Sequence, residues 1–484
     1  MRPLFLLHRY LGIAVGALMA MWCLSGIVMM YVSYPVLSAN LRVAKLSPIA
    51  WSHCCQLADE ALADAAPVSD FAIEMLAGHP VLWLRGGHAR DALIDLSSGA
   101  AIRVSPAQAR SVAESYAPGT ASAVRDLGLI DYDEWTVAGD LDSARPLYHF
   151  SLGDELGSEL YVSSRSGRAV QYTTAHQRFW NWLGSVPHWL YFAQLRRETH
   201  WWRFILIATS VLGCFLAGTG LFLGVRQWLR RPPGRFSPYH GLTLWHHAAG
   251  VLFGLLTLSW VLSGLLSLNP WGWLESGSAQ AERSALTGPA PSGAQVKAAL
   301  RALAAHAVNA SSIRSAPLDG QLFVMATGAN AQRQRFNANA EPAPLGHEDL
   351  ARIATALCSA QAPTPPALLW HEDEYYFSHH RDVVSLPVYR VVSRDRFATR
   401  YYLDPQSGEL LAKIDRGARD YRWWHEGLHR WDFSAALRER PRWDAVMLLL
   451  LTGVTLSAVT GVWLGYRRLA RRRPAGDSGD ELRR

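Results

Sequence analysis

Four long stretches of this 484-residue chain contain no charged residue. This absence of charge excludes an ordinary soluble fold for those stretches. The stretches are Tyr10–Leu41, Phe204–Val225, Ala248–Leu274 and Ala445–Tyr466. A helix needs about 20 apolar residues to cross the hydrocarbon core of a bilayer. We therefore expect four membrane-spanning helices. A signal-peptide cleavage motif is also missing after the first stretch, which favours a retained anchor.

Cysteine is scarce, with five in the whole chain. Cys23 and Cys214 lie inside charge-free stretches, where we expect them to be packing residues. The remaining three, Cys54, Cys55 and Cys358, are an odd number, which excludes complete pairing within the chain. We expect one ordinary disulfide such as Cys55–Cys358, or none. A soft-metal site at His53-Cys54-Cys55 is the alternative.

Basic residues gather in three short segments beside the spans, and this bias predicts the orientation of the chain. Arginines cluster before the first span, between spans two and three, and after span four. Because positive charge favours the cytoplasmic side, we expect both termini in the cytoplasm and the two long segments on the exterior side. The net charge of +7 largely reflects this bias and gives no reason to invoke nucleic acid.

The chain repeats itself. Displaced by 241 positions, residues 146–226 match residues 387–467 without a gap, and displaced by 238 the first span matches the third. His8, Ser25 and Gly26 meet His246, Ser263 and Gly264, while His188 meets His429 and Gly220 meets Gly461. Such ordered matches indicate a tandem duplication with a pseudo-two-fold axis along the membrane normal.

We expect an integral membrane α-helical protein, with a four-helix bundle and two exterior α+β domains. The predicted segments are a first span with its N-terminal residues (1–34), an exterior domain (35–176), an amphipathic interfacial segment (177–197), span two (198–228), a cytoplasmic loop (229–241), span three (242–269), a second exterior domain (270–421), a second interfacial segment (422–440), span four (441–467) and a basic tail (468–484). Helices are expected at Pro106–Ser115 and Gly293–Ala305, and strands at Pro387–Val392 and Thr399–Leu403.

Four repeated histidines carry the strongest chemical signal. His8 and His246 begin spans one and three, whereas His188 and His429 precede spans two and four. Ionisable residues at membrane depth are costly and usually functional, and neutral imidazole is a common ligand of haem iron. We expect one bis-histidine haem near each membrane face, with interfacial hydrogen bonding as the alternative. Weaker haem candidates are His247, His425 and His200, and His371, His379 and His380 are substrate-side candidates.

Glycines line these spans at four-residue spacing. Gly12, Gly16, Gly250 and Gly254 could let a porphyrin lie against a helix or could serve close helix packing, and the pattern does not separate the two. The metal would be haem iron held through the same four histidines, and no catalytic side chain is expected beyond them.

Several motifs resemble the PepSY-associated transmembrane helix family. They are HRYLG (8–12), LWHHAAG (244–250), VLSGLLSLNPW (261–271), YYLDPQSGEL (401–410) and GLHRWDFSAALRERPRWD (427–444). The resemblance covers nearly the whole chain and implies PepSY-like domains in the periplasm and a location in a bacterial inner membrane. The two haems expected from the histidines would then be of the b type. The first copy departs from the family pattern with Pro187-His188, where Leu-His is usual.

Some members of that family are haem-containing reductases that release iron from ferric siderophores. The resemblance therefore implies transmembrane electron transfer that reduces a periplasmic ferric chelate to release Fe(II) for uptake. No GxGxxG motif occurs in the short cytoplasmic segments, so the donor would be a membrane quinol or a separate reductase. The first alternative function is that of a membrane-anchored binding or regulatory module without a redox centre. The second alternative function is that of a siderophore permease accessory.

Overall fold

The computed structural model describes residues 2–57, 62–86, 92–117, 123–358, 364–378 and 383–470, and the chain forms two compact units. The helical unit comprises Met1–Ser33, Phe179–Glu275 and Asp420–Arg484. The sheet unit comprises Tyr34–Arg178 and Ser276–Arg419. Each unit therefore takes segments from both halves of the duplicated sequence.

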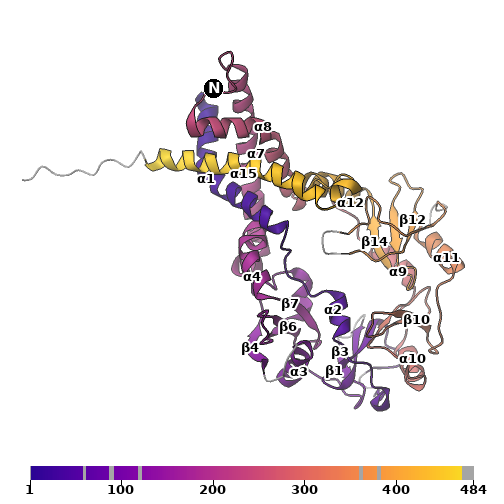
Figure 1. Cartoon of the computed structure of the whole chain (residues 1–484). Coiled ribbons are helices and arrows are strands. Elements are labelled where there is room, and N and C mark those ends of the chain that lie inside the picture. The colour runs from indigo at the N-terminus through magenta and orange to yellow at the C-terminus, as the bar shows by residue number, and fades with distance from the viewer. Residues whose placement is uncertain are drawn as a thin grey trace, which may run out of the picture. The chain divides into compact units, whose positions relative to one another are not determined.

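Four long helices build the helical unit (Figure 1). They are α1 (Arg2–Met29), α7 (Thr199–Leu229), α8 (Gly241–Ser267) and α15 (Arg442–Ala470), and all four are long and apolar enough to cross a membrane. α1 and α8 each pack against both α7 and α15, so α1 lies opposite α8. Cys23, Trp260, Met447 and Val454 are among the side chains buried between them. The expected number of apolar helices of spanning length is confirmed.

Short helices precede α7 and α15 in the same way. The first set is α4 (Ala175–Leu183), α5 (Ser185–Trp189) and α6 (Ala193–Arg197), and the second is η4 (Arg422–Gly427), α13 (Leu428–Arg430) and α14 (Ala435–Arg438). Leu190 and Trp431, 241 positions apart, end α5 and α13 in the left-handed conformation. The indole N–H of Trp202 donates to the Trp189 carbonyl at 2.8 Å, and that of Trp443 to the Arg430 carbonyl at 2.7 Å. The duplication is thus visible in local geometry.

A six-stranded antiparallel sheet crosses the sheet unit in the order β10-β9-β8-β1-β2-β3. Its strands are β1 (Val68–Leu76), β2 (His79–Gly86), β3 (Ala92–Asp95), β8 (Ser312–Ser315), β9 (Phe323–Thr327) and β10 (Arg333–Asn337). The two copies meet where β1 pairs with β8, with Ile73 opposite Ile313. Antiparallel pairing of equivalent strands is what a two-fold axis through this point produces. The exterior segments, expected as one domain each, thus share one sheet.

Each copy also contributes a separate four-stranded antiparallel sheet. The first contains β4 (Arg125–Ile130), β5 (Leu147–Ser151), β6 (Glu159–Ser163) and β7 (Ala169–Thr173), and the second β11 (Ala367–Leu369), β12 (Val388–Val392), β13 (Arg400–Leu403) and β14 (Leu410–Ile414). β12 and β14 fall 241 positions after β5 and β7 at both ends. The expected strands and the α+β character are confirmed.

Helices cover these sheets at matching positions. α3 (Pro106–Tyr116) corresponds to α11 (His347–Leu357), and α2 (Ala39–Ala44) begins 241 positions before α9 (Gln280–Thr287). α3 begins after Ser105, whose hydroxyl accepts from the Gln108 amide while the Gln108 side chain accepts from the Ser105 amide. Ser292 caps α10 (Gly293–Ala305) in the same manner. Both helices expected from the sequence are present.

The cysteines depart from expectation. Cys54 and Cys55 form a disulfide with each other, and Cys358 is a buried free thiol. The expected Cys55–Cys358 bridge is wrong because the two residues belong to different cores. Cys55 packs beside the core of the six-stranded sheet, whereas Cys358 packs with Leu350 and Tyr401 between α11 and the second four-stranded sheet.

Candidate functional site

Two histidine pairs lie within the helical unit, one member of each pair coming from each copy. His8 on α1 and His246 on α8 have ring centroids 6.3 Å apart, with an angle of 36° between their planes. His188 on α5 and His429 on α13 have ring centroids 6.2 Å apart, at 75°. The four residues that the sequence analysis selected are therefore brought together in the expected pairs.

Backbone carbonyls orient the first pair. His8 Nδ1 lies 3.2 Å from the Leu216 carbonyl oxygen, and His246 Nδ1 lies 3.0 Å from the Ser457 carbonyl oxygen, 241 positions later. A carbonyl oxygen only accepts, so each Nδ1 must carry the proton and donate it. The other ring nitrogen, Nε2, is then unprotonated and has a lone pair for a ligand.

Serine hydroxyls orient the second pair. His188 Nδ1 lies 3.0 Å from Ser25 Oγ, and His429 Nδ1 lies 3.0 Å from Ser263 Oγ. Each hydroxyl donates its own proton to a carbonyl three residues earlier, Ser25 to Trp22 at 3.1 Å and Ser263 to Trp260 at 3.0 Å. The serine oxygens are thus acceptors, and Nδ1 again carries the imidazole proton.

Glycines allow the imidazoles to approach the neighbouring helices. A Cβ at Gly220 would lie 2.6 Å from His8 Cε1, and one at Gly461 would lie 2.9 Å from His246 Cε1. Gly26 and Gly264 face His188 and His429 at 3.8 and 3.7 Å. Sequence matching had aligned these glycines and Ser25 with Ser263 without assigning them a role. Their repetition beside repeated histidines was the signal that could have identified them.

Burial keeps the second pair uncharged. It lowers the pKa of His188 to about 4, and it lowers the pKa of His429 well below the usual histidine value, with the neighbouring His425 and His188 adding to the effect. Both rings are therefore neutral imidazole at neutral pH, the form that binds metals.

The spacing of both pairs fits a single metal ion between two imidazoles. A metal–imidazole bond is about 2 Å long and a ring nitrogen lies about 1.1 Å from its centroid, so the two centroids would be about 6.2 Å apart. Two unprotonated Nε2 atoms cannot hydrogen-bond to each other, because both are acceptors. In a metal-ligating histidine, the ring nitrogen that does not bind the metal usually donates its proton to a neighbouring acceptor such as a backbone carbonyl. The residues present thus fit a bis-histidine haem at each pair.

The two pairs lie far apart along the bundle. His8 and the serine that binds His188 are both on α1, 17 positions apart, and His246 and Ser263 have the same separation on α8. At 1.5 Å per residue, this distance along the helix is about 26 Å. It is close to the ~30 Å thickness of a hydrocarbon core.

His247 has a different environment from its neighbour His246. Its Nε2 lies 2.9 Å from the Gly224 carbonyl oxygen, so this nitrogen carries a proton and ties α8 to α7. Tyr239 packs edge-on against the ring at 5.3 Å. The hydrogen bonds therefore favour His246 over His247 as the ligand.

His425 extends the second pair. Its ring lies 5.4 Å from the ring of His429, and its Nδ1 lies 2.9 Å from the Ser263 carbonyl oxygen. Burial lowers the pKa of His425 to about 4. Its counterpart in the first copy is Gly184, so this third imidazole belongs to one copy only.

The other histidine candidates lie elsewhere. His200 is exposed, with its ring edge-on to Trp201 at 5.7 Å. His371 is exposed in the sheet unit. His379 and His380 fall outside the described residues. No group of three or more His, Cys, Asp or Glu that could hold a metal ion occurs among the residues that the structure describes.

The four glycines at four-residue spacing in the first and third spans differ in their surroundings. A Cβ at Gly254 would lie 3.0 Å from Leu221, a tight contact that indicates helix packing. At Gly12, Gly16 and Gly250 the nearest atoms would lie 3.8, 3.5 and 3.7 Å away, which is ordinary contact. These three positions remain compatible with either role.

Comparisons with known proteins add no assignment. No protein-family model matches the chain. No curated protein matches it significantly.

Proposed function

We propose that this chain is a b-type haem protein of a bacterial inner membrane that carries electrons across the bilayer and reduces a ferric siderophore or similar ferric chelate. One observation carries the proposal. Two histidine pairs lie about 26 Å apart along the helices, and the ring centroids within each pair are 6.3 and 6.2 Å apart. In each pair, Nδ1 donates its proton to a carbonyl or serine oxygen of a neighbouring helix.

His8 and His246 would hold one haem, and His188 and His429 the other. Haem iron supplies reversible one-electron chemistry when bound. The chain's own contribution is to present four unprotonated Nε2 atoms, to keep the imidazoles neutral, and to fix their rings through Leu216, Ser457 and the two serines. Two centres are required because a single cofactor cannot bridge a ~30 Å hydrocarbon core.

The membrane location and orientation are part of the proposal. Four apolar helices of spanning length support an integral membrane protein. Arginines near the start of α1, between α7 and α8, and at the end of α15 favour the cytoplasm for those ends. The sheet unit would then be periplasmic, and both termini cytoplasmic. The resemblance to the PepSY-associated transmembrane helix family is consistent with this arrangement.

A ferric chelate is the proposed electron acceptor. Siderophores bind Fe(III) through hard oxygen donors, and they hold Fe(II) less tightly. One electron converts the bound Fe(III) to Fe(II), which the chelator releases for uptake. The electron would enter on the cytoplasmic side from a membrane quinol or a separate reductase.

A visible spectrum of the protein purified in mild detergent from haem-replete cells tests the proposal. We expect a Soret band, a dithionite-induced α-band and two haems per chain. His8→Ala and His429→Ala should each lose one haem, while the exposed His200→Ala should keep both. Absence of a Soret band would sink the reductase proposal and leave a binding or regulatory module.

Reconstitution tests the direction of electron flow. In liposomes with a quinol pool, the wild-type protein should reduce an external ferric hydroxamate, with Fe(II) trapped by a coloured chelator. His429→Ala should lose this activity, and His200→Ala should retain it. Haem without any chelate reduction would restrict the proposal to electron transfer with another acceptor.

A further inference from the structure

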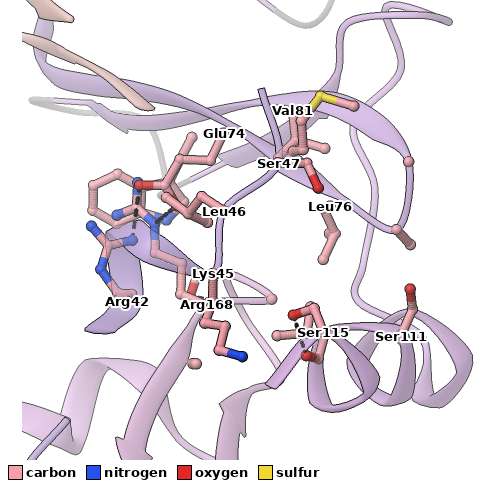
Figure 2. A pocket seen from close by; sticks show the side chains of 18 of the residues that line it. Arg42, Lys45, Leu46, Ser47, Glu74, Leu76, Val81, Ser111, Ser115 and Arg168 are labelled. Carbon is pink, nitrogen blue, oxygen red and sulfur yellow. Dashed lines mark hydrogen bonds and ion pairs between the residues drawn. The ribbon is translucent and has the colours of Figure 1, made fainter. Parts of the chain in front are cut away.

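A cavity of about 120 Å³ lies within the sheet unit, between α2, β1, α3 and the turn that joins β6 to β7. Figure 2 shows Ser111 and Ser115 of α3 along one side, with Arg42, Lys45 and Arg168 on the side opposite. Leu76 and Val81 are among its apolar lining residues. Cations and hydroxyl groups thus line the same cavity.

Positive charge exceeds negative charge in this lining. Glu74, 5% exposed, accepts from Arg42 Nη1 at 2.9 Å and from Arg168 Nε at 3.0 Å. Burial alone would raise the pKa of Glu74, but the two guanidinium groups hold it below its usual value. One carboxylate therefore balances one of two arginines. Lys45 adds a further charge, and no described residue pairs with its ammonium group.

Hydroxyl groups supply neutral donors beside these cations. Ser47 and Ser111 line the cavity. Burial raises the pKa of Tyr116, another lining residue, to about 12, so its hydroxyl stays protonated. Charged and neutral donors arranged together are the chemistry that binds oxyanions.

The second copy has an apolar core at the equivalent place. When the sequence is aligned with itself at an offset of 241 positions, Leu286 corresponds to Lys45, Ala356 to Ser115 and Leu357 to Tyr116. Leu286 and Leu357 are 5% and 6% exposed and pack with Leu350 and Ile353. The fold alone therefore does not require a lysine here. The first copy has the cation, the hydroxyls and a cavity together at this place.

We propose that this pocket of the first copy binds a small organic oxyanion, whose carboxylate or phosphate group contacts Lys45, Arg42 and Arg168. Its carbon skeleton would lie against Leu76 and Val81. The inference concerns a ligand of the sheet unit, goes beyond haem binding and electron transfer, and does not depend on them.

Isothermal titration of the full-length protein in detergent tests this site, with citrate and inorganic phosphate as the two probes. We expect saturable binding of at least one probe that weakens with added NaCl. Preference for citrate would assign a carboxylate ligand, and preference for phosphate a phosphorylated one. Absence of saturable binding by both probes at about 10 mM, the concentration scale of weak anion sites, would overturn the proposal.

Variants locate the binding. Lys45→Leu introduces the residue that the second copy already accommodates, and Lys45→Gln removes the charge while keeping a polar side chain. Both should weaken binding about tenfold or more, because one charge-assisted contact is lost. Arg283→Gln, at the second-copy position equivalent to Arg42, removes the same charge from an exposed site and should leave binding unchanged. Wild-type affinity in both Lys45 variants would refute the assignment.

Discussion

Gly220→Ala provides a sharp test of the first histidine pair. The new Cβ would lie 2.6 Å from His8 Cε1, whereas carbon atoms in contact are about 3.5–4.0 Å apart. The imidazole must therefore move by about 1 Å, five times the ~0.2 Å tolerance of a metal–ligand bond. We expect the variant to lose the haem of this pair and to retain the other, giving about half the wild-type haem content.

The stability of the variant should fall as well. Overpacking costs about 1–3 kcal/mol, while alanine gains about 1 kcal/mol over glycine within a helix. Gly218→Ala is the matched control, because a Cβ there meets nothing within 4 Å and α7 also contains that residue. It should keep both haems and unfold at or above the wild-type temperature.

Haem content by pyridine haemochrome and thermal unfolding in detergent provide the readouts. Gly461→Ala, whose Cβ would lie 2.9 Å from His246 Cε1, should lose the same haem. The double variant should then lose no more haem than either single variant, since both act on one site. Full haem content in Gly220→Ala would refute the close contact and the assignment of His8.

Three further outcomes are expected. His247→Ala should keep both haems and lower thermal stability, because the Nε2 of His247 donates to the Gly224 carbonyl; a lost haem would contradict this. Tyr161→Phe and Tyr402→Phe should each destabilise the protein by about 1–3 kcal/mol in chemical unfolding, since each hydroxyl donates to a carboxylate at 2.7 Å; a large effect of one alone would argue against equivalent roles. The pKa of Glu74 is lowered in the folded state, so its stabilising effect is present above the unfolded value of about 4.3 and is lost as pH falls through the lower folded value. Glu74→Gln should therefore be less stable than wild type at pH 7 and approach it in acid, and a gap that stays constant with pH would contradict the ion pairs.

The sequence alone was sufficient to predict the features that depend on local composition and on internal repetition. Charge-free runs located the four apolar helices because helix length and hydropathy are local properties. The duplication followed from ordered identities such as His8 with His246 and Gly220 with Gly461. It also predicted which histidines would pair, since equivalent residues meet across a two-fold axis.

Tertiary structure decided the features that depend on contacts between distant segments. His246 and His247 are adjacent, and about 100° of helical rotation separates them; only packing against α7 and α15 directs one to His8 and the other to Gly224. The pairing of β1 with β8 likewise joins segments about 240 residues apart, which no local pattern encodes. The cavity beside Lys45 is lined by segments far apart in the sequence, whereas the equivalent Leu286 is buried in an apolar core. Local pattern thus determined the elements, and long-range packing determined which side chains face one another.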